Sequence, residues 1–177
     1  LQHLSGVATA TRSSVAAGAD ASGRVVDTRK TTPGLRQLER AAVRAGGGVS
    51  HRAGLSDPVL LKENHFALSG LSYRDTVAKA VAARSAQNGS VLPSEPAVIA
   101  EARDEVEAKA AVDGGAGVIL LDNFEPGDRL RTLLEELRAM ARSAGREVLF
   151  EVSGGIRPDT AGAYAACGID RLLACLR

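Results

Sequence analysis

The sequence predicts an α/β fold, a (β/α) barrel-like domain with about six parallel strands. First, short and continuously apolar segments alternate with amphipathic helical patterns along the 177 residues, which is typical of a parallel sheet covered by helices. Second, each gap between apolar segments has room for one helix, as parallel connections require. Third, 31 alanines and 19 glycines against 3% aromatic residues indicate close packing between the layers. An open, doubly wound sheet is the alternative architecture.

Six apolar segments rich in Val, Leu and Ile are predicted strands. They are residues 24–28, 59–62, 98–100, 117–121, 148–152 and 171–174. Six amphipathic segments are predicted helices, at residues 1–17, 31–45, 73–86, 104–112, 128–143 and 158–167.

Local signals support the individual elements. In the first helix, Leu4 and Val7 lie on one face at helical spacing. In the second, Thr32 can cap the N-terminus, Pro33 suits the first turn, and glycines 46–48 end the helix. The polar stretch 87–96 is predicted to be a surface loop, and no boundary divides residues 1–177 into two domains.

The composition excludes several classes of protein. Lys and Arg number 22 against 21 Asp and Glu, which argues against a broad nucleic-acid-binding surface. No apolar run approaches the roughly 18 residues of a membrane span. Only Cys167 and Cys175 are cysteines, so a disulfide framework is not expected and a reducing, cytoplasmic setting is. The only methionine is Met140, so we expect Leu1 to follow processing, cleavage or an omitted segment; no signal peptide is visible.

Charged residues and glycines follow the predicted strands. They are Arg29 and Lys30 after the first, Lys62 after the second, Glu101 after the third, Asp122 after the fourth, and Ser153, Gly154 and Gly155 after the fifth. The carboxyl ends of parallel strands open onto one mouth, so these residues are expected to meet there. Positive charge beside carboxylates predicts a polyanionic ligand together with Mg²⁺.

Each of these features also has a simpler interpretation. Arg29 and Lys30 could form a solvated loop, and two successive glycines could be only a tight turn. A zinc site is not expected, because His3, His51 and His65 share no ligand spacing.

Several motifs resemble those of the quinolinate phosphoribosyltransferases. The resemblance is carried by five motifs that occur in the family's order: residues 27–36 (DTRKTTPGLR), 46–55 (GGGVSHRAGL), 60–65 (LLKENH), 119–124 (ILLDNF) and 153–156 (SGGI). Residues 4–9 (LSGVAT) also resemble the segment that enters the family's catalytic domain. The molybdenum-transport-associated ModD group is a near relative, but the sequences at residues 31–36 (TTPGLR) and 62–65 (KENH) are more similar to those of the quinolinate enzymes.

The resemblance implies the α/β barrel of a type II phosphoribosyltransferase. Its reaction transfers phosphoribosyl from phosphoribosyl pyrophosphate to quinolinate with decarboxylation, giving nicotinate mononucleotide, CO₂ and pyrophosphate in NAD biosynthesis. It also implies Mg²⁺ as cofactor, small-molecule substrates rather than nucleic acid or membrane, and a homodimer or higher homo-oligomer.

The resemblance also implies roles for ten residues of this sequence. Arg29, His51, Arg52 and Lys62 would surround quinolinate and so converge on one cavity. Lys30 and Lys62 would neutralise the diphosphate, and Glu101 and Asp122 would hold the ribose hydroxyls and Mg²⁺. The catalytic group would consist of Lys30, Lys62, Glu101 and Asp122. Ser153, Gly154 and Gly155 would bind the 5′-phosphate.

Two features depart from the family's pattern. The family carries an N-terminal domain whose Arg reaches the neighbouring subunit's site, and we expect this chain to be the catalytic barrel without that domain and with a truncated C-terminal end. Cys175 stands where the family has a phosphate-turn glycine, and a side chain there would crowd the phosphate. A catalytically silent fragment that binds phosphate ligands or a partner subunit therefore stays open, as does a ModD-like enzyme with another acceptor.

Overall fold

The computed structural model describes residues 1–18, 24–52, 58–87 and 98–174. Within them lies one six-stranded sheet in the order β1-β6-β5-β4-β3-β2, with every neighbouring pair parallel. The strands are β1 (Arg24–Val26), β2 (Val59–Leu61), β3 (Val98–Ala102), β4 (Val118–Asp122), β5 (Leu149–Ser153) and β6 (Arg171–Leu173). The helices are α1 (Gln2–Ala17), α2 (Arg36–Ala45), α3 (Glu63–Ser69), α4 (Tyr73–Gln87), α5 (Glu105–Gly114), α6 (Asp128–Ser143) and α7 (Pro158–Ala166).

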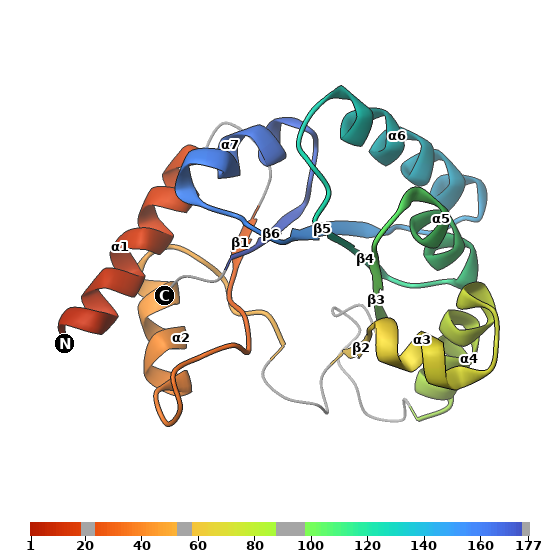
Figure 1. The fold of residues 1–177 in the computed structure, drawn as a ribbon, viewed down its shortest axis with the longest axis horizontal. Coiled ribbons are helices and arrows are strands. Elements are labelled where there is room, and N and C mark those ends of the chain that lie inside the picture. Colours follow the sequence, from red (N-terminus) through yellow and green to blue (C-terminus); the bar gives the residue numbers. More distant parts are fainter. Residues whose placement is uncertain (19–23, 53–57, 88–97, 175–177) are drawn as a thin grey trace.

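The sheet curves like part of a barrel. Figure 1 shows the strands in a curved row with the helices along its outer side. The edges are β1 and β2, which do not pair with each other within the described residues, so the arc is open there. Beyond β1, Val49 makes one parallel bridge to Val26. The predicted (β/α) barrel-like class with about six parallel strands is therefore confirmed, in the form of an incomplete barrel.

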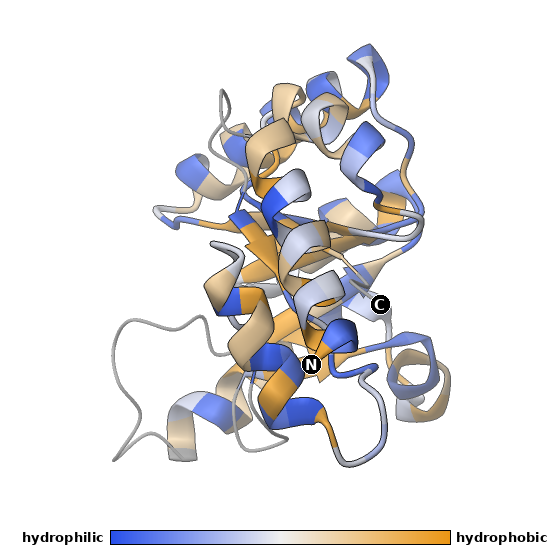
Figure 2. Cartoon of the chain, turned by 90° about the vertical axis from the view of Figure 1, so that its left-hand side faces the viewer, coloured by the Kyte–Doolittle hydropathy of each residue, from blue (hydrophilic) through white to orange (hydrophobic). Residues whose placement is uncertain are grey.

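The two faces of the sheet bury different side chains. The outer face contributes residues such as Phe150 and Val152 to the large cluster that packs under the helices. The inner face carries a smaller cluster of Ile99, Val118 and Leu120. Figure 2 shows mostly hydrophobic strands at the centre and helices that carry both hydrophobic and hydrophilic residues. Both faces are therefore mostly apolar along the middle of the strands, and polar residues of the inner face lie at the strand ends.

The glycine run 46–48 permits a close approach between α1 and the chain that leaves α2. A Cβ on Gly46 would lie 2.5 Å from the Ala8 carbonyl oxygen, and one on Gly48 would lie 2.8 Å from side-chain atoms of Thr11 and Val43. Any larger residue would push α1 outward. The run therefore ends the helix, as predicted, and also sets the path of the chain toward residues 49–52.

Two sequence-based predictions about local structure were wrong, and one helix was missed. Helix α2 begins at Arg36 after an N-cap at Leu35, so Thr32 does not cap it; the Thr32 N–H donates instead to the Glu39 carboxylate. Helix α3 was not predicted, because its seven residues are too few to show a helical period. Glu101 lies inside β3 rather than after it.

Two further predictions concern residues that the structure does not describe. Residues 88–97 of the predicted loop, and Cys175, lie outside the described residues. Among the helices that the structure describes, none combines the length and the apolar character needed to cross a membrane.

Candidate active site

A cavity of about 610 Å³ opens at the carboxyl ends of the strands. All ten residues singled out in the sequence line it: Arg29, Lys30, His51, Arg52, Lys62, Glu101, Asp122, Ser153, Gly154 and Gly155. The expectation that the cations from three separate loops converge on one cavity therefore agrees with the structure.

Sequence reasoning missed several further residues of the wall, which are Thr28, Leu60, Leu120, Asn123, Ile156, Arg157 and Leu173. The sequence did offer a signal for three of them. Leu60 and Leu120 lie two residues before the predicted site residues Lys62 and Asp122, and Asn123 directly follows Asp122. Successive side chains of a strand point to opposite faces, so residues i and i+2 share a face.

Lys62 and Glu101 form an ion pair within the cavity. Lys62 is the N-cap residue of α3, and its N–H donates to Nδ1 of His65 at 2.9 Å. The backbone of Glu101 is held by Tyr73, whose hydroxyl donates to the Glu101 carbonyl oxygen at 2.7 Å. Burial, reinforced by the nearby carboxylates of Glu107 and Glu101, raises the pKa of Tyr73, so this hydroxyl remains a proton donor. The short helix that the sequence did not reveal thus positions the lysine.

Asp122 is oriented by its immediate neighbours at the ends of β4 and β5. Ser153 Oγ donates to Asp122 Oδ1 at 2.6 Å, and Asn123 Nδ2 donates to Oδ2 at 2.9 Å. Gly154 lies against Asn123 with φ of +93°, and a Cβ there would come within 2.1 Å of Asn123 Oδ1. Gly155 also has positive φ, at +63°. Only glycine fits at 154 without moving Asn123, so the turn and the carboxylate form one rigid unit.

The segment that carries His51 is fixed by buried charges near β1. The His51 N–H donates to Asp27 Oδ1 at 2.7 Å. Arg40 from α2 donates to Asp27 Oδ2 at 3.2 Å and to the His51 carbonyl oxygen at 3.3 Å. Asp27 is only 5% exposed, so the ion pair is shielded from solvent. It therefore fixes the backbone of His51 from both sides.

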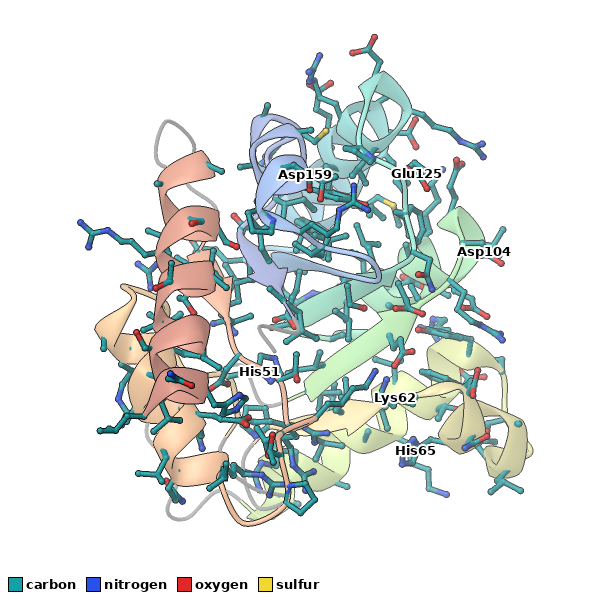
Figure 3. The ribbon with its side chains drawn as sticks, turned by 60° about the vertical axis from the view of Figure 1, so that its left-hand side comes forward. His51, Lys62, His65, Asp104, Glu125 and Asp159 are labelled. Carbon is teal, nitrogen blue, oxygen red and sulfur yellow. The ribbon has the colours of Figure 1, made fainter. Side chains whose placement is uncertain are left out.

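The His51 ring is held from the opposite direction. Its Nε2 lies 3.1 Å from Oε1 and 3.2 Å from Oε2 of Glu151, a fully buried carboxylate on β5. Figure 3 shows His51 and Lys62 reaching toward the inner side of the sheet from its two edges, with His65, Asp104, Glu125 and Asp159 farther out.

Helix α2 also holds the loop that carries Arg29. Arg36 donates to the Arg29 carbonyl oxygen at 3.4 Å. Glu39, 5% exposed, accepts from the Thr32 N–H and contacts His3 Nε2 at 2.8 Å. Burial alone would raise the pKa of Glu39, but the hydrogen bonds from Thr32 and His3 outweigh it and hold the pKa below its usual value. An ionised Glu39 therefore anchors the loop.

Glu101 and Asp122 are the carboxylates suited to a hard cation. They lie on neighbouring strands, and the pairing of Glu101 with Leu120 puts Asp122 on the same face. Their oxygens are donors that Mg²⁺ accepts, and Mg²⁺ normally keeps several waters or substrate oxygens as well. Among the residues with described positions, no cluster of three or more His, Cys, Asp or Glu could hold a metal ion. The residues fit a magnesium ion shared with substrate better than a metal held by protein ligands alone.

Comparison with known proteins identifies the family. Residues 7–175 match the family described as quinolinate phosphoribosyl transferase, C-terminal domain. The chain belongs to this family. A probable carboxylating nicotinate-nucleotide pyrophosphorylase of Methanothermobacter thermautotrophicus is 38% identical over 172 residues, which is 96% of this chain and 57% of that protein. The carboxylating nicotinate-nucleotide pyrophosphorylase of Mycobacterium leprae is 39% identical over 96% of this chain and 55% of its own length.

Solved structures of family members have the same fold. NadC from Streptococcus pyogenes matches with a TM-score of 0.79 and 34% identity, over 98% of this chain and 55% of that one. The nicotinate-nucleotide pyrophosphorylase from Francisella tularensis gives a TM-score of 0.78 and 33% identity, over 98% of this chain and 56% of that one. The chain thus spans somewhat more than half the length of the relatives it matches.

Proposed function

We propose that this chain is the catalytic barrel of a quinolinate phosphoribosyltransferase. It would join quinolinate to the phosphoribosyl group of phosphoribosyl pyrophosphate and release CO₂ and pyrophosphate, giving nicotinate mononucleotide for NAD biosynthesis. The observation that carries the proposal is the single cavity lined by all ten residues. Both substrates are polyanions, and the cavity faces them with four cations and a glycine turn. A cytoplasmic location and a homo-oligomer stay predictions of the sequence.

The cations on the β1 side suit a dicarboxylate. Arg29 and Arg52 carry planar guanidinium groups, which bind carboxylates through two parallel hydrogen bonds. His51 lies beside Arg52 in the same wall. Quinolinate has adjacent carboxylates on a flat ring, so its orientation would be determined by these forks, with the ring nitrogen turned toward the ribose.

The opposite wall suits the phosphoribosyl donor. Glu101 and Asp122 would accept hydrogen bonds from the ribose hydroxyls and share Mg²⁺ with the diphosphate. Lys30 and Lys62 would neutralise the diphosphate as it leaves. The glycine turn at 154–155 would direct backbone N–H groups at the 5′-phosphate. Ser153 already donates to Asp122, so its proposed part is to orient that carboxylate as well as to line the phosphate site.

The chemistry needs positioning and electrostatic stabilisation more than a nucleophile from the protein. The quinolinate nitrogen forms a bond to the anomeric carbon while the bond from that carbon to the pyrophosphate oxygen breaks. Positive charge on the sugar and negative charge on the leaving group both grow, and prearranged cations stabilise the latter. The bond to the neighbouring carboxylate then breaks as CO₂ leaves, the electron pair is stabilised by the ring-nitrogen cation, and solvent supplies the proton.

The direct test is an assay of the purified protein with quinolinate, phosphoribosyl pyrophosphate and Mg²⁺, with products separated by chromatography. Arg52→Ala should weaken quinolinate binding about 10- to 150-fold, since a charge-assisted hydrogen bond contributes about 1.5–3 kcal/mol. Arg131→Ala is the matched control, because Arg131 pairs with exposed Asp128 on α6. Unchanged quinolinate binding in Arg52→Ala would overturn the assignment of the acceptor pocket.

The same assay separates the alternatives. Because the chain spans somewhat more than half of its relatives, we expect residues 1–177 alone to form little nicotinate mononucleotide. Binding of phosphoribosyl pyrophosphate with no turnover, in the protein as the cell makes it, would favour a catalytically silent phosphate-binding or subunit-interaction protein. Turnover with another acceptor but not with quinolinate would favour the ModD-like alternative.

A further inference from the structure

Glu151 is a buried charge that the proposed reaction does not use. It lies on the inner face of β5, opposite Leu120 of β4 and Arg171 of β6 in the strand pairing. It is 0% exposed, and Ile99 and Leu120 on the same face form an apolar cluster. A carboxylate is costly to bury in such surroundings unless a charged or hydrogen-bonding partner compensates it. Its presence on this face therefore requires a partner.

That partner is the ring of His51. Nε2 is hydrogen-bonded to Oε2 at 3.2 Å and lies 3.1 Å from Oε1, which has no hydrogen-bond partner within the described residues. The His51 side chain is only 6% exposed. A carboxylate can only accept a hydrogen bond, so a contact of this kind places the proton on Nε2, which is the arrangement proposed below. The bond to Glu151 thus determines which ring nitrogen is the donor on the buried side.

The backbone and the ring of His51 are held independently. Asp27 and Arg40 hold the backbone N–H and carbonyl, and Glu151 holds the ring from β5, 100 residues away in sequence. A side chain fixed at both ends has its rotamer fixed as well, which is the requirement for a preorganised binding group. His51 lines the cavity while Glu151 lies beneath it.

We propose that Glu151 is a positioning residue, which acts through His51 by holding Nε2 protonated and the ring oriented toward the acceptor. The consequence for quinolinate rests on the proposed function; the placement of the proton does not. Other charged groups lie near the ring. Arg24, Arg52 and Arg171 line a smaller cavity of about 120 Å³ that also touches His51. If Arg171 rather than His51 compensated Glu151, a change at Glu151 would leave the His51 ring unaltered.

The first experiment reads the proton directly. Two-bond ¹H–¹⁵N correlation spectra of the labelled full-length protein distinguish protonated from bare imidazole nitrogens, and the His51→Asn variant assigns the signal. We expect a protonated Nε2 in the wild type and a changed pattern in Glu151→Gln, because the amide can donate as well as accept. A bare Nε2 in the wild type, or an unchanged His51 signal in Glu151→Gln, would overturn the proposal.

The second experiment follows the effect on the substrate. Glu151→Gln should raise KM for quinolinate roughly 10- to 100-fold, the range typical of a carboxylate that orients a metal-binding histidine, and leave KM for phosphoribosyl pyrophosphate within about twofold. His51→Asn with and without Glu151→Gln should then have the same KM for quinolinate. Independent, additive effects would contradict action through His51.

If Glu151→Gln fails to fold, Glu151→Asp replaces it, with and without His51→Asn. Aspartate keeps the negative charge but is one methylene group shorter, so its carboxylate lies farther from the His51 ring. Absence of wild-type turnover would count against the proposed function alone, since the spectra would still decide where the proton lies.

Discussion

The two walls of the cavity are held in place by different means. On the β4–β5 wall, Asp122 is oriented by Ser153 and Asn123, which lie beside it at the strand ends. On the β1 wall, His51 depends on Asp27, on Arg40 from α2, and on Glu151 from β5. The first wall follows from strand register, whereas the second depends on buried charges outside the cavity. Substitutions remote from the ligand should therefore damage the β1 wall more.

The largest effect is expected when the buried pair under the β1 wall is broken. Asp27→Ala leaves Arg40, whose side chain is 11% exposed, without its counter-ion. It also removes the acceptor for the His51 N–H. Breaking a buried pair from one side costs about 3–5 kcal/mol, to be measured by urea unfolding. Asp113→Ala, which breaks an exposed pair with Arg74, is the control and should leave the unfolding midpoint unchanged; equal losses in the two variants would remove the contrast between buried and exposed charge.

A smaller effect is expected at the glycine turn of the other wall, and it distinguishes two adjacent residues. Gly155→Ala meets no atom within 4 Å, so it should cost only the left-handed backbone conformation, about 1–2 kcal/mol. Gly154→Ala adds a collision with Asn123 to the same backbone cost. It should therefore lose more stability and, through Asn123, disturb Asp122. Thermal unfolding measures both variants, and a Gly154→Ala protein as stable as Gly155→Ala would show that Asn123 can move aside freely.

The smallest expected effect is a pH dependence from Glu39. Its pKa is lowered in the folded protein, so its ionised form stabilises the fold above its unfolded pKa of about 4.3. That contribution is lost as the pH falls through the folded value. Glu39→Gln cannot ionise, so its unfolding free energy should decline less than that of the wild type on the acid side of about pH 4.3. Parallel pH curves for the two proteins would contradict an ionised anchor at this position.

The sequence was sufficient for the sheet and for the cavity because both follow from repeating patterns. Apolar segments separated by helical ones predict a parallel sheet, and a parallel sheet brings its strand ends together wherever they lie in the chain. That is why the eight residues predicted at strand ends share one cavity. His51 and Arg52, which lie in the same cavity, were predicted from the family resemblance instead. Boundaries were less certain: the helix after residue 31 begins only at Arg36, and the Thr32 N–H donates to Glu39 within the preceding loop.

What the tertiary structure alone decided is which charges meet. A glutamate within an apolar strand was visible in the sequence at Glu151, but periodicity assigns a residue to a face and says nothing of what the opposite loop presents to it. Its partner His51 lies 100 residues away. The pairing of Asp27 with Arg40 likewise depends on how α2 packs across β1. The sequence by itself determined the layers, the strand ends and the family; the positioning of the β1 wall came from long-range contacts, because buried charges are compensated by neighbours in space and not by neighbours in sequence.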